Sequence, residues 1–486
     1  MSRTQLDSPV KPVTATPART PAVIRLLVLA TFVVILNETI MINAIPRLMS
    51  ALHITEQTAQ WLSTAFMLTM AAVIPITGWF LQRVSTRSAY TTAMGLFLAG
   101  TALATVAPTF EVLLGARIVQ ASGTAVMMPL LMTTLMQVVP EGDRGRVMGN
   151  VTLAISVAPA MGPTVSGVIL QFGSWRLLFA VVLPIAALIM WGGLRQLKNV
   201  GEPRFSTIDW LSVVTAALGF GSLVYGLSRF GGDDTRVALA FAAVGLLSIA
   251  VFILRQLSLQ KNGTPLMDLR TLRHRTYTIA LIMMSVAFLA MIGSMILLPL
   301  YLQNVRGLNP LETGLLVMPG GLAMGLLGPS VGRLFDRFGA RVLIVPGAVG
   351  ITVALAGFTQ VAMSTPFWLV LGLHALLMVS LAATFTPVFT LGLGAVPPSL
   401  YSHGSSILST LQQVSAAIGT ALVITVMGAR AAALRAEGAT EAFANLGGMR
   451  LAFIVGAVLS VIVIVTALLL PARAASTEEQ QPVAVH

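Results

Sequence analysis

Glu38 is an acidic residue in the middle of a long apolar segment, residues 22–45, with no loop close to it. Counted from Arg25, it lies roughly 20 Å along a helix, inside a bilayer core about 30 Å thick. An ionised carboxylate at such a depth costs at least about 2.5 kcal/mol. A carboxyl group there can bind a proton and release it when hydrated, so the residue is a candidate proton carrier. The alternative is a neutral, hydrogen-bonded acid that holds neighbouring helices together.

Arg117 and His374 are two further ionisable side chains within apolar segments. Arg117, in segment 112–139, is a buried cation that needs acceptors. It can form a fixed structural ion pair, or it can modulate the proton affinity of Glu38. His374, in segment 366–396, is either a satisfied interior histidine or a contact for a bound molecule. The chain has no cysteine and only five scattered histidines, so we expect no metal site and no cofactor.

The composition identifies the class of protein that must position these residues. The chain is 56% hydrophobic and 9% charged, with a mean hydropathy of +0.88. Soluble domains are roughly 25% charged, so these values indicate a protein with many membrane spans. The net charge of +12 comes from basic residues in short loops, where they set topology and give no reason to expect nucleic acid as a partner.

Fourteen apolar windows are long enough to span a bilayer. They are too long and too evenly apolar for barrel strands, so we expect an all-α membrane protein with fourteen transmembrane helices. The windows are residues 22–45, 58–81, 88–108, 112–139, 147–172, 176–197, 209–230, 236–257, 276–302, 312–334, 341–363, 366–396, 404–429 and 450–470.

The loops predict the orientation of the chain. With a cytoplasmic N-terminus, far more lysine and arginine residues fall on the cytoplasmic side than on the opposite side. An even number of spans returns the C-terminus to the cytoplasm. We therefore expect residues 1–21 and 471–486 to be disordered cytoplasmic tails of a multi-pass protein of the cell membrane, with the lipid bilayer as its surroundings.

A loop motif occurs twice. After the second span the chain reads Gly78, Gln82, Arg83 and Arg87, and after the tenth it reads Gly332, Asp336, Arg337 and Arg341, with the same spacing. The second copy would follow the eighth span if each half had only six spans, so two spans are inserted between the halves. We expect a first half at 22–197, an inserted pair with linkers at 198–275, and a second half at 276–470. The loops are either a latch that closes one face or simple positive-inside topology signals.

Four motifs resemble the major facilitator superfamily. The loop motif is similar to its GxLxDRxGR signature, and Arg117 with Gln120 is similar to its RxxQGxG motif. Gly162, Pro163 and Gly167 in the fifth span resemble the antiporter motif GxxxGPxxGG. Residues 36–46 resemble the LDxTxxNxAxP motif of the fourteen-span drug:proton antiporters, and the Leu-Asn-Glu-Thr variant is most like the lincomycin-resistance multidrug exporter branch. The resemblance covers residues 22–470.

This chain also departs from those patterns. The acid of the first span is Asn37 here, and Glu38 beside it is displaced by about 100° around the helix. The first loop has Gln82 where the family has Asp, so a charge-assisted contact is lost there. Ala158 and Ser166 replace glycines in the fifth span, where the remaining glycines and Pro163 can also serve only close packing and a kink.

The resemblance implies a proton-coupled multidrug efflux antiporter that exports amphipathic compounds by alternating access. Glu38 would carry the proton, and Asn37, Asn43, Gln60 and His374 would line the substrate cavity. The alternatives are export of an endogenous lipid or metabolite, or a non-transporting sensor. We expect no enzyme, because no catalytic constellation is present, and no ATP-driven pump, because no phosphate-binding loop is present. The expected partners are small molecules and protons, and the expected assembly is a monomer.

Topology gives the first testable prediction. Accessibility tags at residues 10 and 480 should both be cytoplasmic, because fourteen spans return the chain to its starting side. A tag next to Ala439, in the loop before the last span, should be external. Labelling of tagged variants in intact and permeabilised cells measures this, and a cytoplasmic tag at Ala439 would refute the count of fourteen.

Overall fold

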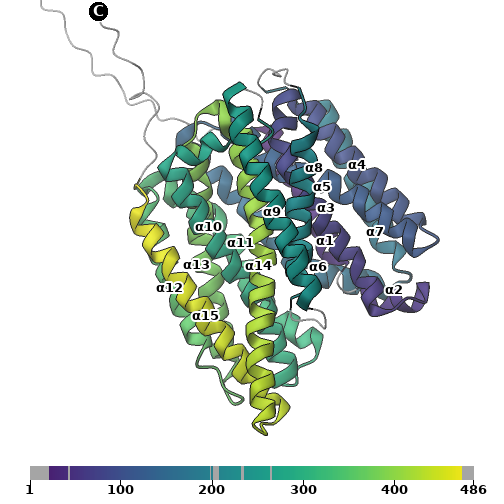
Figure 1. The fold of residues 1–486 in the computed structure, drawn as a ribbon, viewed down its shortest axis with the longest axis vertical. Coiled ribbons are helices and arrows are strands. Elements are labelled where there is room, and N and C mark those ends of the chain that lie inside the picture. Colours follow the sequence, from purple (N-terminus) through teal and green to yellow (C-terminus); the bar gives the residue numbers. More distant parts are fainter. Residues whose placement is uncertain are drawn as a thin grey trace, which may run out of the picture.

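The computed structural model describes residues 21–41, 44–197, 199–200, 207–230, 235–262 and 265–472. In these residues the fold is all helical, with one short helix, α2, and fourteen long ones (Figure 1). The helices are α1 (Ala22–Ile40), α2 (Ile45–Leu52), α3 (Glu56–Arg83), α4 (Thr86–Val106), α5 (Phe110–Val138), α6 (Arg144–Gln171), α7 (Arg176–Gln196), α8 (Trp210–Ser228), α9 (Thr235–Leu259), α10 (Arg275–Leu300), α11 (Pro310–Phe338), α12 (Arg341–Phe358), α13 (Phe367–Gly394), α14 (Tyr401–Ala436) and α15 (Glu441–Leu469).

The prediction of an all-helical protein with fourteen spans is confirmed. Thirteen of the described helices are long and apolar enough to cross a bilayer, and α6 is the fourteenth when it is counted as one bent span. It bends by 41° between Gly162 and Thr164. The residue between them is Pro163, and a proline inside a helix removes a backbone hydrogen bond and kinks the helix. The tails at 1–20 and 473–486 and the linker residues 201–206 lie outside the described part.

The helices pack in the same pattern in the two predicted halves. In the first half α5 packs on α3 and α4, α7 packs on α4, and α6 packs on α1. In the second half α13 packs on α11 and α12, α15 packs on α12, and α14 packs on α10. Each helix of the first half thus has a counterpart eight spans further on, as an internal repeat with an inserted pair requires.

Two pairs of arginines repeat this symmetry. Arg176 at the start of α7 donates to the Ala107 carbonyl at the end of α4, at 2.6 Å, and Arg450 in α15 donates to the Val361 carbonyl after α12, at 2.7 Å. At the other end of the bundle, Arg87 in α4 donates to the carbonyl of Leu194 in α7, and Arg341 in α12 donates to the carbonyl of Leu468 in α15. The last carbonyls of a helix lack partners, so these cations stabilise helix ends.

The two halves meet along two seams. One seam joins α6 to α11 and the other joins α3 to α14. The inserted pair lies over the second seam, since α8 packs on α9, α3 and α14; in Figure 1 the teal α8 and α9 cross the junction between the purple and blue first half and the green and yellow second half. The inserted pair therefore covers one seam and leaves the other to direct helix contact.

Glycines set the distance between α6 and α11. A Cβ atom on Gly149 would collide with the backbone of Gly328, and one on Gly332 would collide with the backbone of Gly145. Small residues allow helix backbones to approach closely in membranes, where dispersion contacts replace the hydrophobic effect as the driving force. The glycine of the second loop motif is thus part of the seam as well as of the loop.

Adding side-chain volume at the seam should prevent its closure. In Gly149→Val the new methyl groups meet the Gly328 backbone, which costs about 1–3 kcal/mol of overpacking and should open the seam. The chain has no cysteine, so spin labels at introduced cysteines Ser88→Cys and Leu334→Cys, both exposed, report the distance between the halves. Gly115→Val is the matched control, because a Cβ at Gly115 meets nothing within 4 Å. An unchanged distance in Gly149→Val would contradict this account of the seam.

Candidate functional site

Arg117 lies at the centre of a polar cluster inside the first half. Its side chain is buried in α5, and its guanidinium donates to Asn37 Oδ1 of α1 at 3.3 Å and to Gln120 Oε1 at 3.0 Å. The guanidinium carbon also lies 4.1 Å from the ring centre of Phe66 in α3, a cation–π contact. The arginine therefore joins three helices, which is how a buried cation is stabilised where water is absent.

The Arg117 cluster extends to a fourth helix. Gln120 donates from Nε2 to Thr101 Oγ1 of α4 at 2.8 Å, and both side chains are buried. Gly123 allows this approach, because a Cβ there would collide with the backbone of Ala93 and Phe97. The spacing Arg-x-x-Gln thus has a physical reason, since residues three apart share one face of a helix. Sequence reasoning missed Thr101 and Phe66, which have no motif of their own.

Glu38 lies beside this cluster but is not bound into it. It follows Asn37 in α1 and is partly exposed, whereas Asn37 is fully buried. Within the described residues Glu38 forms no ion pair closer than 4.0 Å, although Arg117 is near enough for the two charges to interact. Successive residues of a helix are about 100° apart, so Asn37 and Glu38 face different sides of α1, and it is Asn37 that binds the arginine. Glu38 lies in the last turn of α1, and an acid there that no ion pair fixes can exchange its proton.

The antiporter motif touches the residue next to Glu38. A Cβ at Gly162 in α6 would collide with Thr39 Oγ1, so the glycine permits α1 and α6 to pack at this level. Gly162 is also the residue at which α6 bends. In contrast, a Cβ at Gly167 would meet nothing within 4 Å. The structure thus brings one of the motif glycines, and not the other, to the acid-bearing turn of α1.

The remaining predicted cavity residues lie elsewhere. Gln60 is exposed near the start of α3, and His374 is buried in α13 against Gly320 of α11. Asn43 lies outside the described residues. Of the three expected cavity residues that the structure describes, only Asn37 joins the Arg117 cluster, and its oxygen is already used by the guanidinium.

The loop motifs form contacts between the halves. Asp336 at the end of α11 accepts hydrogen bonds from the backbone N–H groups of Gly145 and Arg146, at 2.8 and 2.7 Å. These are the first residues of α6, where backbone N–H groups lack partners and the helix dipole attracts negative charge. Asp336 thus holds the second half to the first with two charge-assisted hydrogen bonds.

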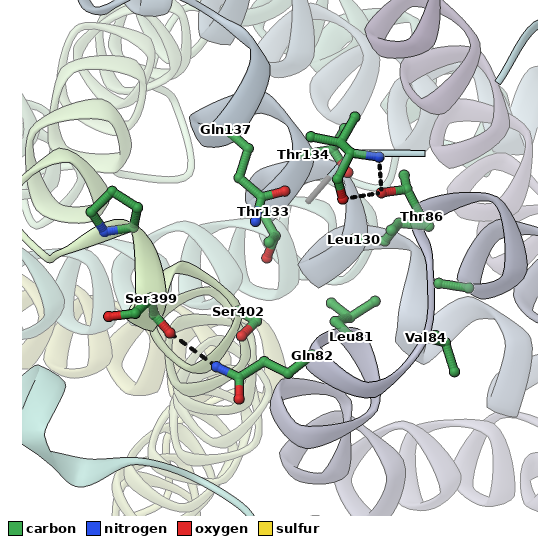
Figure 2. Close-up of a pocket in the computed structure, with 13 residues that line it drawn as sticks. Leu81, Gln82, Val84, Thr86, Leu130, Thr133, Thr134, Gln137, Ser399 and Ser402 are labelled. Carbon is green, nitrogen blue, oxygen red and sulfur yellow. Dashed lines mark hydrogen bonds between the residues drawn. The ribbon is translucent and has the colours of Figure 1, made fainter. Parts of the chain in front are cut away.

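The first loop motif makes a weaker version of this contact. Gln82 at the end of α3 donates from Nε2 to the carbonyl of Ser399, just before α14, at 2.9 Å (Figure 2). A neutral amide replaces the acid, so no charge assists this bond.

The arginines of both loop motifs lie over aromatic rings of their own helices. Arg83 lies over the ring of Trp79, and Arg337 lies over the ring of Phe338. Beside Gln82 is a small polar pocket of about 220 Å³, lined in part by Thr133, Gln137 and Ser402.

Further hydrogen bonds close the same end of the bundle, which we call the loop end. Thr133 and Ser405 share a bond of 2.7 Å, Thr152 and Thr386 share one of 2.8 Å, and Ser406 donates to the carbonyl of Ile74 at 2.7 Å. All of these bonds join the first half to the second within the loop-end part of the spans. The described residues therefore form a conformation that is closed at the loop end. The serines of α14 that make these bonds were not singled out from the sequence.

Comparisons with known proteins agree with this arrangement. A family model of the Major Facilitator Superfamily matches residues 27–420. The chain is 38% identical over 470 residues to the uncharacterized MFS-type transporter YcnB of Bacillus subtilis, covering 96% of this chain and 98% of that protein. It is 37% identical over 441 residues to the lincomycin resistance protein LmrB of Listeria monocytogenes, covering 89% and 93%. The crystal structure of the human organic anion transporter MFSD10 matches with a TM-score of 0.64 at 14% identity, covering 92% of this chain and 100% of that one.

The two loop motifs should contribute unequally to closure of the loop end. Asp336→Asn removes the charge and one acceptor and should weaken the closed state by about 1.5–3 kcal/mol, whereas Gln82→Ala removes one neutral bond worth about 1 kcal/mol. Transport at matched expression should fall strongly in the first variant and modestly in the second. The distance between labels at positions 88 and 334 should lengthen in the same order. Equal effects in the two variants would refute the asymmetry.

Proposed function

Because the chain belongs to the Major Facilitator Superfamily and is a multi-pass transporter of the cell membrane rather than an enzyme, we propose that it is a proton-coupled antiporter that exports amphipathic organic compounds. One observation carries the coupling part of this proposal. Glu38 lies in the last turn of α1, partly exposed and free of any ion pair with a described residue, next to the buried Arg117 cluster. A titratable acid in a membrane span is a functional group by default, because burying it unpaired is costly.

The exchange of proton for cargo follows from the position of Glu38. The loop end is closed, so when it faces the cytoplasm Glu38 would take its proton from the external side. When the halves rock and the loop end opens, hydration and the nearby charge of Arg117 favour release of the proton inward. Cargo and proton then use the same central space at different times, and the inward flow of protons drives cargo outward.

Arg117 and the antiporter motif would link Glu38 to this motion. The arginine fixes α1 to α5 through Asn37, so the acid stays at a constant distance from a cation while the helices move as one body. Gly162 packs on Thr39, one residue from Glu38, and lies on α6, which forms a seam with the second half. A change in the bend of α6 would therefore reach the acid-bearing turn directly. Asn37 would serve this framework, which leaves Gln60 and His374 as the described candidates for cargo contact.

The cargo class rests on the relatives. The relative from Listeria monocytogenes is named for resistance to the antibiotic lincomycin, and the match covers 93% of that protein. Export of an endogenous lipid or metabolite uses the same chemistry and remains the second candidate.

Replacing Glu38 tests the coupling directly. Glu38→Gln keeps the size and hydrogen-bonding capacity of the side chain but cannot titrate, so uphill efflux driven by a pH gradient should be abolished. Glu38→Asp still titrates and should keep part of the activity. Cargo efflux and proton movement in proteoliposomes with an imposed pH gradient measure both effects.

The matched control is Glu111→Gln, a carboxylate on the exposed first turn of α5, which should transport as the parent protein does. Downhill binding or exchange of an uncharged cargo should persist in Glu38→Gln, because it does not need the carboxylate. Full gradient-driven efflux by correctly inserted Glu38→Gln protein would leave Glu38 a structural acid and transfer the proton-carrying role to another group.

A further inference from the structure

The inserted pair is connected to the second half by a series of hydrogen bonds that ends in a turn packed on α10 and α14. It begins at Gln256 near the end of α9, whose side chain is fully buried. Gln256 donates from Nε2 to Ser212 Oγ of α8 at 2.7 Å and accepts at Oε1 from the backbone N–H groups of Leu266 and Met267, at 2.8 and 3.2 Å. One amide thus joins both inserted helices to the linker that follows them, and no motif of the family resemblance includes it.

An ion pair anchors the loop-end termini of the inserted helices to one another. Arg255, the neighbour of Gln256, donates to both carboxylate oxygens of Asp209 at 2.9 and 3.1 Å. These hydrogen bonds lower the pKa of Asp209 to about 2, so the residue is ionised at every physiological pH. Asp209 also accepts the backbone N–H of Ser212, which caps the start of α8. The start of α8 and the end of α9 are therefore fixed to each other at the point where the linker to the second half begins.

The linker then turns onto the second half. Asp268 is buried and accepts hydrogen bonds from the backbone N–H, Nε and Nη2 of Arg270 at 2.6–3.0 Å. Burial alone would raise the pKa of Asp268, but the bonds from Arg270 outweigh it and hold that pKa below its usual range. The turn at 269–273, whose start Asp268 caps, packs on both α10 and α14.

The part of α14 reached by the linker is the part that closes the loop end. His403 is buried and lies against Gly78 of the first loop motif, where a Cβ would come within 2.9 Å of its Nδ1 atom. Two residues further on, Ser405 and Ser406 make hydrogen bonds to the first half. Tyr277 of α10 donates to the Gly404 carbonyl in the same turn, at 2.7 Å. The linker, α3 and the closing serines therefore meet on one turn of α14.

We propose that the inserted pair supports the closed loop end, with Gln256 as the positioning residue that holds the linker and the turn at 269–273, fixed by the Asp268–Arg270 pair, as its contact with α14. The pair is suited to this role because α8 packs on both α3 and α14, one helix from each half. When the loop end opens, α14 must separate from α3, and the linker must release or follow it. The contacts of Gln256 therefore add to the stability of one state of the transport cycle and not of the other. This inference concerns the gate and does not depend on proton coupling or on the cargo.

The experiment measures the balance of the two states without any gradient. Spin labels at Ser88→Cys and Leu334→Cys in an otherwise cysteine-free chain report the distance between the halves at the loop end in purified, lipid-reconstituted protein. Gln256→Leu removes both the donor and the acceptor and should raise the ratio of open to closed protein at least about fivefold. Gln256→Glu keeps the acceptor for Leu266 and Met267 and should shift the ratio less.

The control is Ser460→Ala in α15, a buried side chain whose hydrogen bond to Thr352, at 2.8 Å, lies away from the seams. It should leave the ratio of the two states unchanged. A purely structural role for Gln256 would lower the yield of folded protein in Gln256→Leu but leave the ratio at the parent value, and that outcome overturns the proposal. An equal shift in Ser460→Ala overturns it too.

A second variant covers the case in which Gln256→Leu does not fold. Asp268→Asn keeps the shape of the side chain and loses the charge that binds Arg270, which weakens the turn packed on α14, so it should also raise the open fraction. An unchanged ratio in folded Asp268→Asn would show that the linker does not stabilise α14 through this pair. Since these ratios need no cargo and no proton gradient, they stay informative even if Glu38 has no part in coupling.

Discussion

The need to satisfy one buried cation organises the first half of this protein. Water is absent at the depth of Arg117, so its guanidinium must find acceptors on neighbouring helices, and it finds them on α1 and on its own helix while resting on Phe66 of α3. Its partner Gln120 adds α4 through Thr101. These helices therefore share one polar centre, which ties them to one another and keeps Asn37, the neighbour of Glu38, on the cation. Alternating access requires such rigid halves.

The number of spans and the buried charges could be predicted from the sequence because they depend on composition along a single stretch of chain. Apolar runs of about 20 residues define spans wherever they occur, and an arginine or glutamate inside one stands out without any knowledge of its neighbours. The displacement of Glu38 from Asn37 likewise follows from helix geometry alone. Only the structure shows which of these two neighbours binds the arginine: Asn37 accepts a hydrogen bond from Arg117, and Glu38 does not.

The contacts that close the loop end could not be read from the sequence in this way. Gln82 and Ser399 are 317 residues apart, and Thr133 and Ser405 are 272 apart, so only the packing of whole helices brings them together. Hydroxyls in a membrane helix commonly return to their own backbone, and nothing local distinguishes those that bond to another helix. Gln256 was missed for the same reason: it lies at the end of an apolar span, and its partners on α8 and in the linker have no pattern of their own.

The two seams also determine how a molecule dissolved in the bilayer can reach the interior. At the loop end, the seam between α6 and α11 brings glycine backbones so close that an added methyl group would not fit, and the other seam lies under α8. A lipid tail is thicker than a methyl group, so the loop-end halves of both seams exclude the hydrocarbon phase in this state. A molecule dissolved in the leaflet at the loop end is therefore kept out of the bundle by the same contacts that keep water out.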